Sequence, residues 1–235
     1  MLQVRGVSRQ FGGVRALDDM SLEVAAGELA CVIGPNGCGK TTLLNVVTGQ
    51  VAPSGGEVEL DGVSLLGRRP DAIARLGVAR KFQVPSIFED LTVRENLGVA
   101  RAASGRGRAL PELTDVLADI HLEAEADQPA GGLSHGAKQW LEIGMLLAQA
   151  PRLMLLDEPT AGMSRAETAA TAGLLRQLRE RAGVAIVVVE HDMQFVEALG
   201  ARVVVMIAGR VVGDGRYEDV RRLPAVREAY LGAHA

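Results

Sequence analysis

The stretch Gly34-Pro35-Asn36-Gly37-Cys38-Gly39-Lys40-Thr41 decides the fold of this chain, because it is a complete G-x-x-x-x-G-K-[ST] phosphate loop. An apolar run at residues 29–33 precedes the loop, and a second apolar-rich run begins at Thr42 directly after it. These flanks predict a strand before the loop and a helix after it, which is the context in which the motif binds phosphate. The glycines let backbone N–H groups converge on phosphate oxygens, and the helix N-terminus adds a favourable field for an anion. We therefore expect the chain to bind a nucleoside triphosphate.

The side chains of the loop have separate predicted roles. Lys40 can reach the β- and γ-phosphates, and the Thr41 hydroxyl can ligate Mg²⁺. We assign the whole stretch from Gly34 to Thr42 to the nucleotide site. A nucleotide and Mg²⁺ are the cofactors that this assignment implies.

Composition narrows the class of protein. The chain has 235 residues, 48% of them hydrophobic, which suits one domain with a packed core. A net charge of −4 argues against a general nucleic-acid binder. Two cysteines give no disulfide framework and fit a reducing cytosol. No apolar run reaches the ~18–20 residues of a membrane-spanning helix, and no export signal is evident at the N-terminus, so we expect membrane contact only through a partner.

Strand and helix patterns alternate over most of the chain. Apolar runs of strand length lie at 153–156, 184–189 and 203–207, and 165–181 has the leucine spacing of a helix. Near the N-terminus, a strand-like start and a turn at 11–13 precede a further strand at 22–24. Buried strands that alternate with helices predict an α/β fold with a mainly parallel sheet covered on both faces.

The segment from about 84 to 140 has a different pattern, with helical spacing and no convincing strand. Thr92-Val93-Arg94-Glu95 is a capping box that starts one helix, and apolar residues between Pro111 and Ile120 mark another. Residues 102–108 form a polar loop with arginines, which we interpret as a solvated surface loop rather than a basic binding patch. This segment is predicted to be a helical insertion.

Two adjacent carboxylates end the apolar run at 153–156. Asp157 has the position from which an acid at the end of a neighbouring strand holds the Mg²⁺ shell of a phosphate-loop enzyme. Glu158 follows at the exit of the strand, where a carboxylate can accept a proton from an attacking water or orient it. The alternative is that Glu158 only caps the next segment. The pair favours Mg²⁺-dependent hydrolysis of a nucleoside triphosphate.

A third motif lies between these two. Leu133-Ser134-His135-Gly136 precedes a long helical run, with Ser134 as a natural N-cap. By itself this would be a capped helix start. Together with the phosphate loop, Gln83 after a strand, Asp157-Glu158 and His191 after the last core strand, it makes the chain resemble the ATP-binding subunits of ABC transporters over essentially its whole length.

The resemblance implies a single ATP-binding domain over residues 1–235. Its P-loop NTPase core covers 1–83 and 141–235 and includes an antiparallel N-terminal β subdomain. Residues 84–140 form the inserted α-helical subdomain that carries the signature motif. The cofactors are ATP and Mg²⁺.

The resemblance also assigns roles to single residues. Phe11 matches an aromatic that stacks on adenine, and a flat ring suits a purine. Gln83 matches the glutamine that contacts Mg²⁺ and the attacking water, and His191 matches the histidine at the γ-phosphate. The metal site is thus Thr41, Gln83 and Asp157, and the catalytic set is Glu158, His191 and Gln83. Ser134 and Gly136 close over the ATP of an opposing subunit.

Three residues depart from the common family pattern. His135 replaces a glycine, Ala137 replaces a glutamine near the ribose, and Ser164 stands where many relatives have aspartate. Ser164-Arg165-Ala166-Glu167 is itself a capping box, so the serine has a reason to be there. None of the three removes the phosphate loop, the metal ligand or the base, and we expect an active Mg²⁺-dependent ATPase.

The signature motif and the Trp-Leu-Glu-Ile run at 140–143 resemble the branched-chain amino-acid importer branch, and most of all its urea-transporting members. Urea import is therefore the expected function, with branched-chain amino-acid import as the alternative. Lipopolysaccharide-type export and a soluble non-transport ATPase are further alternatives. The expected partners are a second ATP-binding subunit, identical or a sister chain, permease subunits at the helical subdomain and, indirectly, an extracytoplasmic solute-binding protein. The chain would lie at the cytoplasmic face of the plasma membrane.

Overall fold

The larger of two sheets carries the predicted parallel core. The computed structural model describes residues 1–81, 87–104 and 109–231. The strand order is β10-β9-β3-β8-β7-β6, and every pair is parallel except the edge pair β10–β9. The strands are β3 (Leu29–Ile33), β6 (Val78–Lys81), β7 (Leu153–Asp157), β8 (Ala185–Val189), β9 (Arg202–Ile207) and β10 (Arg210–Arg216).

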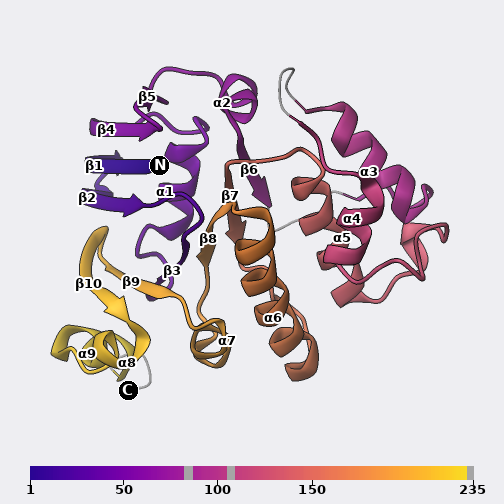
Figure 1. Ribbon diagram of the computed structural model, residues 1–235. Helices are drawn as coiled ribbons and strands as arrows, with labels where there is room; N and C mark the ends of the chain where they lie inside the picture. Colours follow the sequence, from indigo (N-terminus) through magenta and orange to yellow (C-terminus); the bar gives the residue numbers. More distant parts are fainter. Residues whose placement is uncertain (82–86, 105–108, 232–235) are drawn as a thin grey trace.

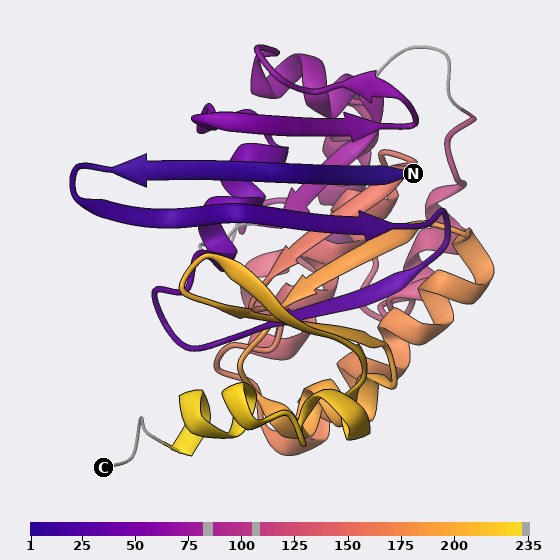
Figure 2. The ribbon, with the colours of Figure 1, turned by 90° about the vertical axis from the view of Figure 1, so that its left-hand side faces the viewer.

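The second sheet is antiparallel and formed by the N-terminal part of the chain, in the order β2-β1-β4-β5. It consists of β1 (Leu2–Phe11), β2 (Val14–Val24), β4 (Gly55–Leu60) and β5 (Val63–Ser64). Figure 2 shows β1 and β2 as a long hairpin. The sequence predicted only residues 22–24 of β2, because polar and apolar residues do not alternate regularly in the first half of this strand. The antiparallel subdomain itself is confirmed.

The six-stranded sheet lies between two hydrophobic cores. On one face, Ala30 and Val32 of β3 pack with α1 (Lys40–Val47) and the antiparallel sheet. On the other face, Cys31 and Ile33 pack with helices α6 (Arg165–Ala182) and α7 (Met193–Leu199). Side chains alternate between the faces with the period of two that a strand imposes, so a fully buried apolar strand serves both cores. Figure 1 shows α1 and α6 on either side of the sheet.

The inserted helices lie on the side of the molecule away from the antiparallel sheet (Figure 1). They are α3 (Val93–Ala102), α4 (Leu113–Asp119) and α5 (His135–Leu147). The predicted capping box at Thr92 is present, with Thr92 Oγ1 accepting from the Glu95 N–H and the Glu95 carboxylate accepting in return. The described residues between 87 and 140 form no strand beyond one isolated bridge. The expected subdomain boundary at residue 140 falls inside α5.

Some shorter elements were not predicted. Helix α2 (Pro70–Leu76) begins with proline at its first position and ends at Gly77, which are helix-boundary signals that the prediction overlooked. Helices α8 (Tyr217–Val220) and α9 (Pro224–Leu231) lie beside the β9–β10 hairpin. Among the described residues, no helix is both long and apolar enough to span a bilayer.

Candidate functional site

The phosphate loop connects β3 to α1, and its shape depends on glycine at two close approaches. A Cβ on Gly34 would lie 2.1 Å from the Met206 carbonyl oxygen, and one on Gly39 would lie 2.2 Å from that of Ala16. Gly39 has φ 109°, a conformation that side chains strongly disfavour. The loop is therefore held between β2 and the end of β9, and only glycine fits at these points.

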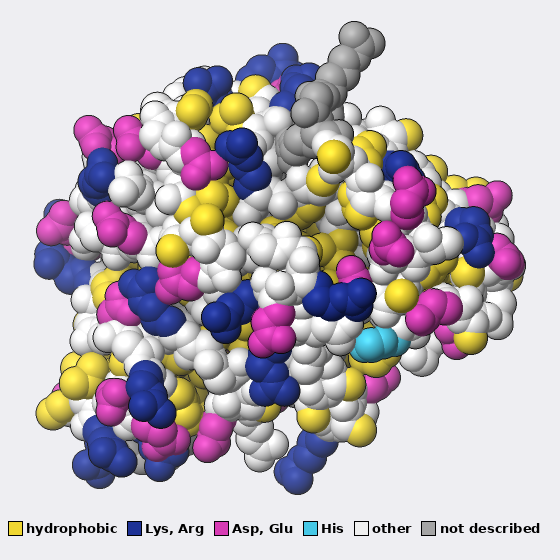
Figure 3. All heavy atoms as spheres, viewed as in Figure 1, with side chains coloured by type: hydrophobic (Ala, Val, Ile, Leu, Met, Phe, Trp, Pro, Cys, Tyr) yellow, Lys and Arg dark blue, Asp and Glu magenta, His cyan; other side chains and the backbone are white. Residues whose placement is uncertain are grey.

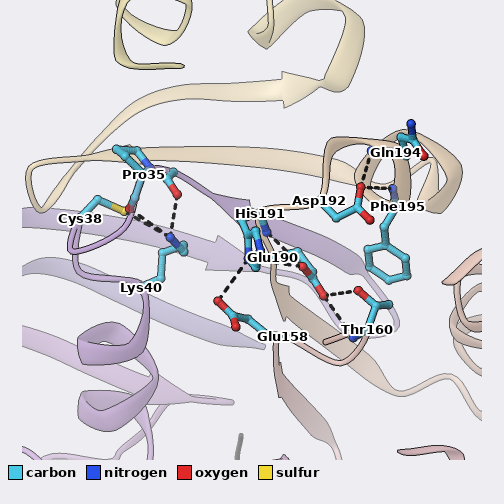
Figure 4. A network of polar contacts seen from close by, with 11 residues as sticks. Pro35, Cys38, Lys40, Glu158, Thr160, Glu190, His191, Asp192, Gln194 and Phe195 are labelled. Atoms are coloured by element: carbon cyan, nitrogen blue, oxygen red, sulfur yellow. Dashed lines mark hydrogen bonds and ion pairs between the residues drawn. The ribbon is translucent and has the colours of Figure 1, made fainter. Parts of the chain in front are cut away.

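Lys40 is the first residue of α1 and is buried. Its Nζ donates to the carbonyl oxygens of Gly34 at 2.7 Å and Pro35 at 3.1 Å, so the side chain folds back over the loop (Figure 4). Helix α1 has no side-chain cap at Gly39, so its first amides remain available to an anion. A cation above a ring of open amides is the arrangement that binds phosphate.

A pocket of about 320 Å³ opens at this loop. It brings the predicted phosphate-loop residues together with the predicted base, Glu158, which lies more than 100 residues later in the sequence. Its lining residues are Ala16, Asn36, Gly37, Gly39, Lys40, Thr41, Thr42 and Glu158. A larger pocket, of about 720 Å³, lies elsewhere, between α2, β6 and the ends of α3 and α5, and is lined by none of the predicted site residues.

Glu158 lies directly after β7 in a backbone conformation that is rare for its residue type. It has φ 48°, and its N–H donates to the Val189 carbonyl oxygen at 2.9 Å. Such left-handed backbone costs free energy and is held here by the neighbouring strand. The Glu158 carboxylate lies 3.3 Å from His191 Nδ1, and both side chains remain partly exposed (Figure 4). The structure thus places the predicted base and the predicted histidine side by side at the mouth of the pocket.

Asp157 ends β7 and is almost fully buried. Its Oδ2 accepts from Arg80 at 3.1 Å, whereas Oδ1 has no hydrogen-bond partner among the described residues. Burial raises the pKa of Asp157, and the Arg80 guanidinium opposes that rise. A buried carboxylate oxygen without a donor suits a hard cation such as Mg²⁺. Thr41 and Asp157 fit the expected metal site, and its third expected ligand, Gln83, lies outside the described residues.

A buried carboxylate that was not predicted from the sequence stabilises the segments around this site. Glu190, the residue after β8, is buried and accepts from the Thr160 hydroxyl at 2.7 Å and the Thr160 N–H at 3.2 Å. It also accepts from the His191 N–H at 3.0 Å (Figure 4). Glu190 therefore joins the segment after Glu158 to the segment that carries His191. Its signal in the sequence is the one used for Asp157, a carboxylate at the end of a buried strand.

The other predicted residues lie outside this pocket. Phe11 ends β1 and is 44% exposed, with the Arg9 guanidinium 4.5 Å from its ring centre. Ser134 caps α5 by accepting from the Ala137 N–H at 3.2 Å. Gly136 lies in the first turn of α5 against Glu167, because a Cβ there would lie 2.5 Å from the Glu167 carboxylate. Neither Phe11 nor the signature residues line the pocket.

Two of the unusual residues have local explanations. His135 Nε2 lies 2.9 Å from the Ala161 carbonyl oxygen, which connects the start of α5 to the segment after Glu158. The predicted capping box at Ser164 is present, with the Ser164 hydroxyl accepting from the Glu167 N–H. Nothing in the structure explains Ala137 beyond its packing against the core.

Residues 17–161, more than half of the chain, match the ABC transporter protein family. The chain belongs to the ABC transporter family of ATP-binding proteins. It is 34% identical over 249 residues to the branched-chain amino acid transport ATP-binding protein BraF of Pseudomonas aeruginosa, with 99% of this chain and 98% of BraF covered. It is 35% identical over 249 residues to LivG of Salmonella typhimurium, a protein of the same description, with the same coverage.

Solved ABC structures have the same fold. The ADP-bound ATP-binding cassette MJ1267 superposes with a TM-score of 0.86 at 28% identity, covering 99% of this chain and 98% of that one. The dimeric, post-hydrolysis cassette MJ0796 bound to ADP and phosphate gives a TM-score of 0.77 at 26% identity, covering 92% and 98%. This ABC protein is an ATPase, and ATP with Mg²⁺ are the cofactors of its family.

Proposed function

We propose that this ABC protein is the ATP-hydrolysing subunit of an importer for amino acids of the branched-chain type. The observation that carries the proposal is the pocket in which the phosphate loop and Glu158 meet. The substrate class is supported by BraF and LivG, both named for branched-chain amino acid transport. Urea, expected first from the signature motif, becomes the second candidate, because these full-length relatives are named for amino acids.

In this proposal the open amides of α1 and the Lys40 ammonium bind the triphosphate. Lys40 exchanges the Gly34 and Pro35 carbonyl oxygens for phosphate oxygens. Glu158 accepts a proton from the attacking water, and His191 beside it orients the Glu158 carboxylate. Mg²⁺, held by Thr41, Asp157 and Gln83, would neutralise phosphate charge when bound. Phe11 would stack on the adenine.

The signature residues serve a second subunit. Ser134 and Gly136 lie at the N-terminus of α5, outside the pocket of their own chain. Ser134 is exposed, whereas Gly136 is buried against Glu167, so Glu167 would have to move before Gly136 could contact a nucleotide bound by another chain. The dimeric form of MJ0796 supports this arrangement. We leave open whether the second ATP-binding subunit is identical or a sister chain, because both present the same motif. Purification of the complete transporter with a tag on this chain alone distinguishes the two.

The permease is proposed to dock where the inserted helices meet the core. Two pockets, of about 720 and 310 Å³, adjoin there and share Asp71, Ala74, Val78, Ala79 and Gln149. Figure 3 shows basic and acidic side chains interspersed with apolar ones over the face seen in Figure 1, which supports contact with protein rather than nucleic acid. Through the permease the chain would lie at the cytoplasmic face of the plasma membrane and respond indirectly to a solute-binding protein.

Replacement of the proposed base tests the catalytic assignment. Glu158→Gln keeps the shape of the side chain but cannot accept a proton, so we expect kcat to fall by roughly 10²–10⁴-fold. The ATP affinity should stay near wild type, and ATP should trap a dimer on size exclusion. Glu57→Gln, at an exposed residue of β4, is the matched control and should retain full turnover. A Glu158→Gln variant that turns over at half the wild-type rate or more would refute the assignment.

A transport assay tests the substrate. The chain is co-expressed with the permease and binding-protein genes that neighbour its own, and uptake of labelled leucine and labelled urea is measured. Leucine uptake that is lost with Glu158→Gln supports the proposal. Uptake of urea alone supports the second candidate, and co-sedimentation with ribosomes without uptake of either would refute an importer.

A further inference from the structure

Arg80 joins two parts of the site that are far apart in the sequence. It lies in β6, and its side chain is 5% exposed. One terminal nitrogen, Nη2, donates to Asp157 Oδ2 at 3.1 Å, across 77 residues of sequence. The other, Nη1, donates to Asn45 Oδ1 at 2.7 Å and to Thr48 Oγ1 at 3.3 Å. The sequence analysis assigned no role to this arginine.

The guanidinium of Arg80 joins the C-terminal end of α1 to the end of β7. Asn45 and Thr48 lie at the C-terminal end of α1, and the same helix begins with Lys40 and Thr41. The Arg80 guanidinium therefore connects the helix that presents the Thr41 hydroxyl to the carboxylate of Asp157. Because the guanidinium is planar and its nitrogens are fixed relative to each other, it also sets the orientation of one partner with respect to the other.

The contact at Asp157 uses only one carboxylate oxygen. Oδ2 is held by Arg80, and Oδ1 remains buried with no partner in the described part of the chain. A buried acceptor that lacks a donor costs free energy, so it is kept for a ligand that compensates it. Arg80 thus leaves one oxygen of Asp157 available and fixes the direction in which it points.

We propose that Arg80 is a positioning residue for Mg²⁺, which orients Asp157 and the Thr41-bearing helix so that both can ligate the ion of Mg-ATP. This inference rests on the proposed function of the pocket. A partner that orients a metal ligand typically contributes 10–100-fold to metal affinity. A purely structural ion pair would instead affect folding and nucleotide binding to the same degree with and without the metal.

The test compares nucleotide affinity with and without the metal. The dissociation constant of the non-hydrolysable analogue AMP-PNP is measured calorimetrically in EDTA and in Mg²⁺, and their ratio gives the gain from the metal. In Arg80→Gln we expect the gain to fall roughly 10–100-fold, with the affinity in EDTA changed less than about threefold. Arg80→Lys keeps the positive charge but lacks the planar guanidinium with its two donor nitrogens, and should lose part of the gain in affinity from Mg²⁺. Equal losses in EDTA and Mg²⁺, or no loss, would overturn the proposal.

Three further variants separate the proposed role of Arg80 from a loss of folding and from an error in the proposed nucleotide site. Asn45→Ala, at a half-buried position, removes the nearest partner of Nη1 and leaves Thr48 and Gln50 at 3.3 and 3.5 Å. It should reduce the gain less than Arg80→Gln does, and an unchanged gain would also overturn the proposal. Arg152→Gln breaks an exposed ion pair to Asp61 of 2.9 Å and is the matched control that should behave as wild type. Lys40→Ala should lose affinity under both conditions. If it does not, the proposed nucleotide site is wrong, whatever Arg80 does.

Discussion

Thr160→Val tests whether the buried Glu190 carboxylate holds the catalytic segment. The substitution removes the hydroxyl that donates to Glu190 Oε1 at 2.7 Å, and both side chains are almost fully buried. A hydrogen bond to a charged group contributes about 1.5–3 kcal/mol, so we expect a loss of about 2 kcal/mol in the free energy of unfolding. For a chain of this size that lowers Tm by about 4–8 °C.

Turnover should fall as well. Thr160 lies two residues after Glu158, and the carboxylate it contacts also accepts from the His191 N–H at 3.0 Å. We expect kcat to fall roughly tenfold, which corresponds to about 1.4 kcal/mol of transition-state stabilisation. The affinity for ATP should remain unchanged, because the phosphate loop does not take part in this network. Scanning calorimetry and a phosphate-release assay measure the two effects.

Thr171→Val is the matched control. Thr171 is fully buried, and its hydroxyl accepts from Trp140 Nε1 at 2.9 Å. The same hydroxyl lies 2.8 Å from the Glu167 carbonyl oxygen and 3.3 Å from the Met163 sulfur, to either of which it can donate. None of these three partners lines the pocket, so the substitution should lower Tm by a similar amount and leave kcat within about twofold. If Thr160→Val lowers Tm while kcat stays at the control level, Glu190 only stabilises the fold. If neither quantity changes, the assigned hydrogen bond is wrong.

Three further predictions concern the loop and the signature region. Gly39→Ala should lose most of the ATP affinity because its Cβ would lie 2.2 Å from a backbone oxygen. Gly37→Ala meets no atom within 4 Å and is strained only by its φ of +77°, so it should lose less affinity in the same titration. Cys38 is 4% exposed, and burial raises its thiol pKa. It should therefore react with iodoacetamide more slowly than a free thiol at pH 7.5, faster as the pH rises, and more slowly again when ATP is bound. Rapid labelling confirmed at Cys38 at pH 7.5 would contradict this prediction. Ser164→Ala should lower the free energy of unfolding by about 1 kcal/mol, because it removes the N-cap of α6. Ser164→Asp keeps a capping side chain and should have a free energy of unfolding near that of the wild type. Equal losses for the two variants in urea denaturation would refute the capping role.

The features that sequence reasoning predicted well depend on neighbouring residues. The capping boxes at Thr92 and Ser164 each span four residues and form as expected. Helix α7 also begins at a local signal, since Asp192 before it accepts from the first-turn amides. The phosphate loop was likewise predicted from consecutive residues, although β9 and β2 approach two of its glycines, Gly34 and Gly39. In each case the pattern that allowed the prediction lies within a few residues.

The features that were missed depend on residues brought together from far apart. Glu190 meets Thr160 across 30 residues, and Arg80 meets Asp157 across 77. Read along the sequence, Arg80 belongs to a short strand and Glu190 merely precedes a histidine, so neither has a recognisable partner.

A phosphate loop between a buried strand and a helix is enough to establish nucleotide binding, because the chemistry resides in consecutive backbone amides and one lysine. The family motifs around it extend that to an ABC ATPase. Only the parallel sheet determines how the site is completed, because it aligns the ends of β6, β7 and β8 at one edge. There Arg80 holds one oxygen of Asp157, Glu190 holds the segment after Glu158, and the signature motif lies outside the lining of the chain's own pocket. Such contacts follow from strand order and register, which no local pattern encodes.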